Sequence, residues 1–387
     1  MLNFYDVPAA GAGPVPLPPA GLGTVAIDFN AAKAMIKSVW KPWFATSPVL
    51  APPPSIPITI NDIAFAMATD SGAAMPLIAC QAYCGIYLAG PLIAAQPWMG
   101  SLTSHHRRCA DELLGVAMSL ATAKSKGYLF IASKTEMNAA LPPKIEFWTK
   151  PWADDGPDYV MDDGMGGISF LEVKGRANIC QKFPSGFARH KAQSVNANLM
   201  GLQKRYLLSY AYFPAGGFGA APVLATVQWF NATTSKRQIK KEEENSQLRI
   251  FLQLTIAYCQ FKTQMRNAGY EMNILEKSAK ASDFGFSKRY NCWVEIKNIG
   301  EPQLVIPIQS RACFLGIRDL LVRAKEEEDI GFLNKLKLAP ILKKLNALRN
   351  EVRKKVDEIS FDGITLHRYA TGVYIVGTSD DNVIARN

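Results

Sequence analysis

Apolar and polar positions divide the middle of the chain into one helix and three short strands. Residues 113–120 carry apolar side chains at helical spacing. Three apolar runs follow, at residues 128–132, 159–161 and 168–173. Asp-Asp-Gly and Gly-Gly separate the last two runs and are strong turn signals. The pattern therefore predicts a helix, a strand and then a β-hairpin.

The remainder of the chain adds further predicted elements. Residues 1–24 are rich in Pro, Ala and Gly, which predicts an extended arm on the surface or on a partner. Helices are predicted at residues 30–42, 60–70 (capped by Asn61 or Asp62), 185–210, within 236–268 and within 311–358. Strands are predicted at residues 222–230 and 290–310, with a hairpin around Thr371-Gly372.

One long segment, Ser71 to Ser104, contains no charged residue. About 20 apolar residues suffice to cross a membrane. This segment, however, is interrupted by prolines and glutamines and is rich in small residues. We therefore expect helices that are buried or face a partner, and a membrane anchor is the alternative interpretation.

The predicted hairpin brings chemically useful side chains together. Side chains alternate along a strand, so Glu172 and Lys174 point to one side and Val173 to the other. Asp158 precedes the first strand and can reach the same end of the hairpin. Two converging carboxylates form a site for Mg²⁺ or Mn²⁺, to which the Val173 carbonyl could add a ligand. Such a cation activates water and neutralises charge on a phosphate, while Lys174 can orient that water.

The motif itself is Pro-Asp at residues 157–158, followed after thirteen residues by Glu-Val-Lys at 172–174. It resembles the PD-(D/E)XK phosphodiesterase superfamily, which includes restriction enzymes, repair nucleases and anti-phage effectors. The resemblance covers roughly residues 105–235. It implies an α/β fold with a restriction-endonuclease-like core, in which helices flank a central mixed sheet.

The resemblance also implies roles for individual residues. Asp158 and Glu172 would hold the metal, and Lys174 would act on the attacking water. The core of this superfamily often opens with a helix that carries an acidic residue, and Glu112 fits that place. The alternative is an edge hairpin in which Asp158 caps a turn and Glu172 and Lys174 form a cross-strand or surface ion pair.

A second Glu-x-Lys sequence, at residues 295–297, shows that this short pattern also occurs outside the context of the predicted hairpin. Asp283 lies upstream of it, but no proline precedes that aspartate and no comparable helix and strand come before it. We interpret this second sequence as a structural strand.

Charge is distributed unevenly along the chain. The formal net charge is +10, yet residues 1–104 hold three lysines against four aspartates, so the excess positive charge follows residue 104. This distribution favours a polyphosphate partner. Arg176, Lys182, Arg189 and Lys191 follow the hairpin and are candidate phosphate contacts, with a solvated helical face as the alternative. The Lys/Arg cluster at 343–355 is interpreted as a solvated face rather than a DNA-facing ridge.

Cysteine usage and the N-terminal sequence bear on the compartment. The seven cysteines are scattered without a C-x-x-C pair, and no basic segment followed by an apolar core opens the sequence. Both features predict reduced thiols in a cytoplasmic protein.

We therefore expect a Mg²⁺- or Mn²⁺-dependent DNA endonuclease, with RNA as a substrate still open. The expected regions are an arm with apolar helices (1–104), the nuclease core (105–235) and an α+β region that recognises substrate or a partner (236–387). By analogy with the superfamily, we expect a homo-oligomer or an effector paired with another subunit, in restriction or anti-phage defence. The alternatives are a non-catalytic nucleic-acid-binding or assembly protein, and a membrane-associated protein.

Overall fold

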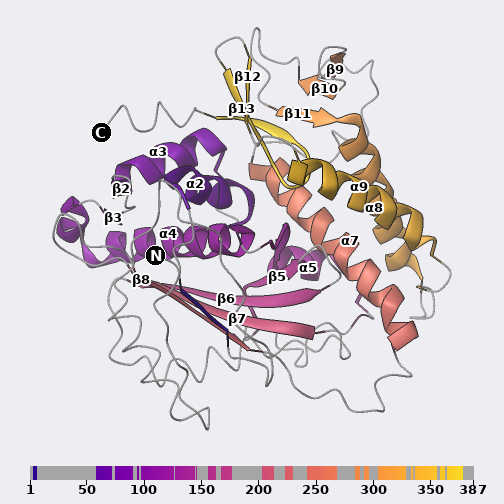
Figure 1. Ribbon diagram of the computed structural model, residues 1–387, viewed down its shortest axis with the longest axis horizontal. Helices are drawn as coiled ribbons and strands as arrows, with labels where there is room; N and C mark the ends of the chain where they lie inside the picture. Colours follow the sequence, from indigo (N-terminus) through magenta and orange to yellow (C-terminus); the bar gives the residue numbers. More distant parts are fainter. Residues whose placement is uncertain are drawn as a thin grey trace.

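Two six-stranded sheets and the helices packed on them make up a mixed α/β structure (Figure 1). The computed structural model describes residues 3–6, 58–71, 75–89, 94–95, 97–125, 127–143, 145, 156–162, 167–176, 203–212, 223–229, 242–267, 284–287, 292–295, 304–327, 333, 336–354, 358–361 and 364–377. The helix predicted at 30–42 and most of the predicted N-terminal arm lie outside these residues.

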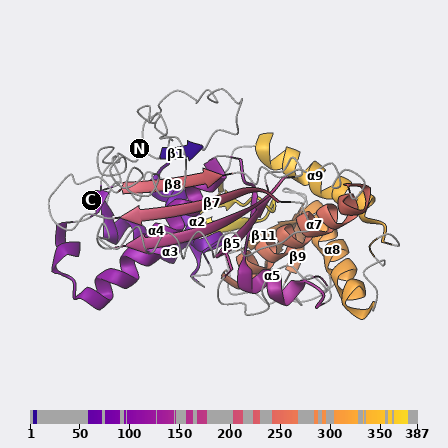
Figure 2. The same ribbon diagram turned by 90° about the horizontal axis from the view of Figure 1, so that it is seen from below.

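The first sheet has the strand order β1-β8-β7-β6-β5-β4 (Figure 2). Its strands are β1 (Asn3–Asp6), β4 (Phe130–Ser133), β5 (Tyr159–Asp162), β6 (Ile168–Arg176), β7 (Gln203–Tyr212) and β8 (Val223–Trp229). β4, β5 and β6 form an antiparallel meander, and β7 lies parallel to β6. β8 is antiparallel to β7, and β1 is parallel to β8 at the edge. The sheet is therefore mixed, and the hairpin predicted from the turn signals is confirmed.

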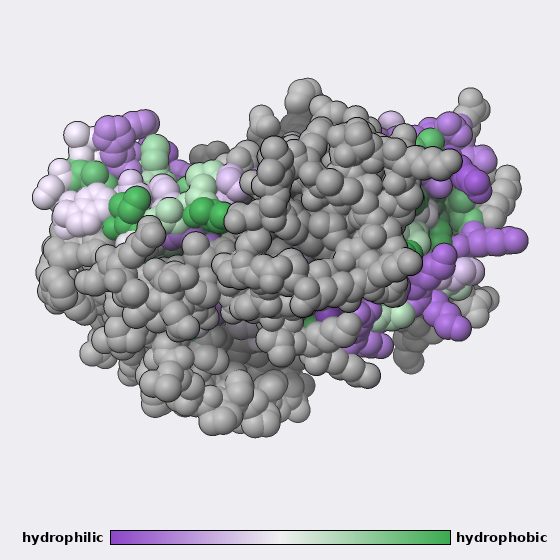
Figure 3. Space-filling view, turned by 90° about the horizontal axis from the view of Figure 1, so that it is seen from above, coloured by the Kyte–Doolittle hydropathy of each residue, from purple (hydrophilic) through white to green (hydrophobic). Residues whose placement is uncertain are grey.

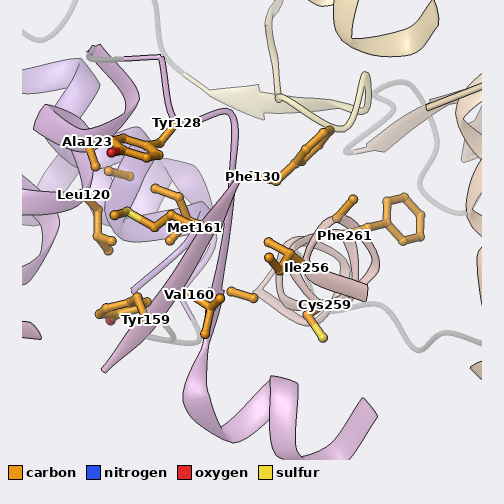
Figure 4. Packing of buried hydrophobic residues seen from close by; sticks show 14 of the residues in the cluster. Leu120, Ala123, Tyr128, Phe130, Tyr159, Val160, Met161, Ile256, Cys259 and Phe261 are labelled. Carbon is orange, nitrogen blue, oxygen red and sulfur yellow. The ribbon is translucent and has the colours of Figure 1, made fainter. Parts of the chain in front are cut away.

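Helices cover both faces of this sheet. α4 (Ser104–Ser125) packs against β6 and β7, and α7 (Glu242–Asn267) packs against β4 and β5. Figure 4 shows Tyr159 and Met161 of β5 on the same side as Leu120 of α4, whereas Val160 lies on the side of Ile256 of α7. β5 thus alternates between two apolar layers, and every residue along it is buried.

The prediction of a helix over residues 185–210 is wrong at β7. The helix predicted for residues 185–210 does not extend over 203–210, which belong to the strand. β7 pairs with β6 on one side and β8 on the other, so its backbone hydrogen bonds are satisfied within the sheet. Its sequence, QKRYLLSYAY, is rich in the aromatic residues that favour strands.

Of the two N-terminal helices, α2 (Ile60–Thr69) packs against α4, and α3 (Leu77–Tyr87) packs against α2. The short elements β2 (Leu88–Ala89), β3 (Ala94–Ala95) and η1 (Pro97–Ser101) follow. The cap of α2 differs from the prediction, because Thr59 caps the helix and exchanges hydrogen bonds with Asp62 in a capping box. Among the described residues, no helix is both long enough and apolar enough to span a membrane.

The C-terminal part contributes the second sheet, with the order β12-β13-β14-β11-β10-β9. The strands of this sheet are β9 (Phe284–Ser287), β10 (Cys292–Glu295), β11 (Leu304–Pro307), β12 (Glu358–Phe361), β13 (Ile364–Arg368) and β14 (Tyr374–Gly377). The helices α8 (Ile308–Glu326) and α9 (Leu338–Lys354) lie between β11 and β12 in the sequence. β13 and β14 form the predicted hairpin, with Gly372 at a φ of 78°. Glu295 of the second Glu-x-Lys sequence ends β10, while Lys297 and Asp283 lie outside the described residues.

Candidate functional site

Three predicted site residues meet at one end of the β5–β6 hairpin. Tyr159 lies opposite Leu171 in the antiparallel register, which places Asp158 beside Glu172. The Val173 backbone N–H donates a hydrogen bond to Asp158 Oδ2 at 2.9 Å. Lys174 Nζ lies 2.5 Å from Glu172 Oε1 and 3.5 Å from Asp158 Oδ2. The alternation along β6 thus brings Glu172 and Lys174 to one face, as predicted.

Exposure rises across the cluster. The Glu172 side chain is fully buried, the Lys174 side chain is 20% exposed and the Asp158 side chain is 39% exposed. A ligand from solvent therefore meets Asp158 and Lys174 first, with Glu172 beneath them. The burial of Glu172 excludes an ion pair that lies wholly at the surface. The contact of Lys174 with Asp158 on the neighbouring strand is also compatible with the structural alternative, a cross-strand ion pair.

The pKa of Glu172 is raised to about 8, and burial is the largest cause. The nearby Asp158 carboxylate contributes to the rise, while the Lys174 ammonium opposes both effects. Without another cation, the two carboxylates and one lysine favour keeping a proton on Glu172. A divalent cation bound beside Glu172 would lower the pKa of this carboxyl and displace the proton.

The chemistry of the cluster fits a hard divalent cation. Glu172 Oε2 is buried and has no hydrogen-bond partner among the described residues, and an orphaned buried carboxylate oxygen is costly. Mg²⁺ takes one or two protein carboxylates and keeps several waters. Among the described residues, no group of three or more His, Cys, Asp or Glu side chains is placed so that it could hold a metal ion. The role of the Val173 carbonyl as a ligand stays a prediction.

Glu112 is not brought into this cluster. It is exposed on α4, and the backbone of α4 lies against Gly175. Gly175 alternates with Lys174, so α4 covers the face of β6 opposite to the one that carries Glu172 and Lys174. The remaining predicted contacts are not placed: the side chain of Arg176 and the whole of Lys182, Arg189 and Lys191 lie outside the described residues.

The contact at Gly175 explains why this position is glycine. A Cβ there would come within 2.4 Å of the Asp111 carbonyl oxygen and 2.5 Å of the Glu112 Cα, both of them backbone atoms. The glycine lets α4 pack directly on the strand that carries the site.

Gly175→Ala is expected to destabilise the protein by about 1–3 kcal/mol, because helix and strand must separate to admit the methyl group. Thermal unfolding followed by circular dichroism measures the change. Gly316→Ala is the matched control, since no atom lies within 4 Å of a Cβ at that helical position. Equal melting temperatures for the Gly175 variant and the wild type would contradict this packing.

One buried interaction, at the other end of β5, could not be predicted from the sequence. Asp162 is fully buried and pairs with Arg349 of α9, and Gln253 of α7 donates a hydrogen bond to it at 3.1 Å. The Arg349 guanidinium also lies over the Phe130 ring, 4.9 Å from its centroid. The interpretation of residues 343–355 as a solvated face is therefore wrong at Arg349, whose side chain is 3% exposed. The strand that follows Asp158 is thus fixed to the C-terminal helices.

Comparisons with known proteins neither add to this description nor correct it. The chain matches no family model, no curated protein and no solved structure. The functional argument therefore depends on the geometry of the site itself.

Proposed function

We propose that the protein is a metal-dependent nuclease that hydrolyses DNA phosphodiester bonds. The observation that carries this proposal is the convergence of Asp158, Glu172 and Lys174 at one end of a hairpin, where one oxygen of the buried Glu172 carboxylate has no hydrogen-bond partner within the described part of the chain. A carboxylate pair with an adjacent lysine is suited to holding a divalent cation beside a phosphate.

The arrangement of elements supports a restriction-endonuclease-like core. α4 precedes an antiparallel meander, β4 to β6, and the meander carries both halves of the motif. β7 then lies parallel to β6, so the sheet is mixed, and helices cover both of its faces. This frame agrees with the one that the motif's resemblance implies, and restriction or anti-phage defence follows from it by analogy.

Each side chain has a distinct task in the proposed mechanism. Asp158 and Glu172 hold the cation, and the Val173 N–H keeps Asp158 directed toward Glu172. The bound cation supplies Lewis acidity and neutralises charge on the phosphate. Lys174 donates to the attacking water or to the phosphate oxygen on which charge develops. The burial of Glu172 strengthens these electrostatic interactions by excluding water.

The test is cleavage of supercoiled and linear DNA with Mg²⁺, Mn²⁺ or EDTA. Wild-type protein is expected to cut with either metal and not with EDTA, and Asp158→Asn is expected to lose the activity because a metal ligand loses its charge. Asp319→Asn is the matched control, since that aspartate is exposed on α8 and pairs with the neighbouring Arg318. Cutting in EDTA, or undiminished cutting by Asp158→Asn, would overturn the proposal. Salt-sensitive DNA binding without cutting would favour the non-catalytic scaffold.

A further inference from the structure

Three aromatic rings form a ledge near the start of α4. The ring centroids of Tyr83 and Tyr87 on α3 are 4.5 Å apart, and that of Trp98 on η1 lies 5.1 Å from Tyr87. We call these three residues the aromatic ledge. Trp98 is 40% exposed, and on the same helix as the tyrosines Ile78 and Ile86 are 48% and 55% exposed. Figure 3 shows hydrophobic and near-neutral residues next to hydrophilic ones at this end of the molecule.

The residues of the aromatic ledge and those that follow it in sequence, as far as Arg108, are neutral or basic, and exposed Glu112 comes one helical turn later. The aromatic ledge belongs to the segment from Ser71 to Ser104 that contains no charged residue. α4 starts immediately afterwards and has no acidic residue in its first turn. Exposed His105, His106 and Arg108 lie on its first two turns. The N-terminus of this 22-residue helix adds partial positive charge from its free N–H groups.

The aromatic ledge and the candidate metal site lie near the same end of β6, but α4 covers the face of β6 opposite to the one that carries Glu172 and Lys174. Tyr83 lies close to Cys109 in the second turn of α4. One turn later, the backbone of Glu112 contacts Gly175, the residue that follows Lys174. Arg108 and Glu112 are about 6 Å apart along the helix axis. A strand of nucleic acid that reached both places would pass around this end of β6.

We propose that the aromatic ledge stacks the bases of single-stranded nucleic acid, while Arg108 and the start of α4 bind its phosphates. The inference deepens the proposed nuclease function and rests on it for the meaning of the neighbouring site. Bases stack on aromatic rings whatever their sequence, and phosphates need cations or N–H donors close by. The aromatic ledge supplies an uncharged stacking surface with a basic border. Duplex DNA fits less well, because its bases are already stacked inside the helix.

The binding test uses a fluorescein-labelled deoxythymidine 12-mer, with anisotropy read in EDTA so that no cleavage occurs. Trp98→Ala is expected to weaken binding roughly 5- to 100-fold, as for the loss of one stacked base, and Trp98→Phe is expected to retain most of the affinity. Arg108→Ala is expected to weaken binding and to reduce the salt slope by roughly one. Val322→Ala is the control, since Val322 is an exposed apolar residue on α8, 50% accessible.

Several outcomes would overturn the inference. The first is that the wild type does not bind single-stranded DNA. The second is that Trp98→Ala and Tyr87→Ala leave the affinity unchanged. The third is that the protein prefers duplex DNA and that neither substitution changes this preference. A change in oligomeric state on substitution of Trp98, with DNA affinity unchanged, would assign the aromatic ledge to contact with a second copy and would also overturn it. The binding assay is independent of cleavage. If the protein binds through the aromatic ledge but never cuts DNA, the nuclease proposal is rejected and the binding role of the aromatic ledge is retained. If the protein cuts DNA and binding does not depend on the aromatic ledge, the nuclease proposal is retained and the binding role is rejected.

Discussion

Glu172→Gln is expected to lower the rate of DNA cleavage roughly a thousand-fold or more, because a metal site contributes several kcal/mol to catalysis. The same change is expected to stabilise the metal-free protein at pH 8, on the order of 1–3 kcal/mol. Loss of activity with a gain of stability distinguishes a functional carboxylate from a structural one. A buried ion pair kept for stability would give the opposite change in melting temperature.

The pH dependence of this stabilisation follows from the raised pKa of Glu172. Its ordinary value is 4.5, and in the folded protein it is about 8. Between these values the folded protein keeps a proton that the unfolded chain has released, so wild-type stability falls as pH rises through the window. The gap in melting temperature between Glu172→Gln and wild type in EDTA should therefore widen from pH 5 to pH 8. Glu326→Gln, an exposed change on α8, is the control, and a gap that stays constant with pH would contradict the buried, strained carboxylate.

Lys174→Met is expected to reduce the rate constant for cleavage by roughly 10²–10³ while leaving metal binding intact or tighter. The lysine contacts both carboxylates, so its removal leaves them free for the cation. Single-turnover cleavage gives the rate constant, and a Mn²⁺ titration of the same sample gives the affinity. Lys337→Met, at an exposed position before α9, serves as the matched control. Weakened Mn²⁺ binding with an unchanged rate constant would assign Lys174 a purely structural role.

The hairpin and its three polar residues could be predicted because the information is local. Turn signals fix where the β5 and β6 runs meet, and alternation then fixes which side chains share a face. β7 could not be predicted in the same way. Its apolar residues Leu207 and Leu208 are consecutive, so this run lacks the period of two that marks a strand with one buried face.

The remaining features depend on residues far apart in the sequence. Arg349 was assigned to solvent because its neighbours are basic, and only the packing of α9 shows that it pairs with Asp162, 187 residues away. Glu112 lies on a helix at the predicted place in the chain, but the face of the sheet that α4 covers is set by tertiary packing at Gly175. The complete burial of Glu172, which gives the site its electrostatic character, likewise follows from packing rather than from the motif.

The central claim is that Asp158 and Glu172 together hold a divalent cation, and calorimetric titration of Mn²⁺ tests it without requiring a substrate or a partner. We expect one Mn²⁺ per chain for wild type and for Asp319→Asn, and loss of that binding for Asp158→Asn and Glu172→Gln. Mn²⁺ binding that is absent in the wild type, or unchanged in both site variants, would contradict the account.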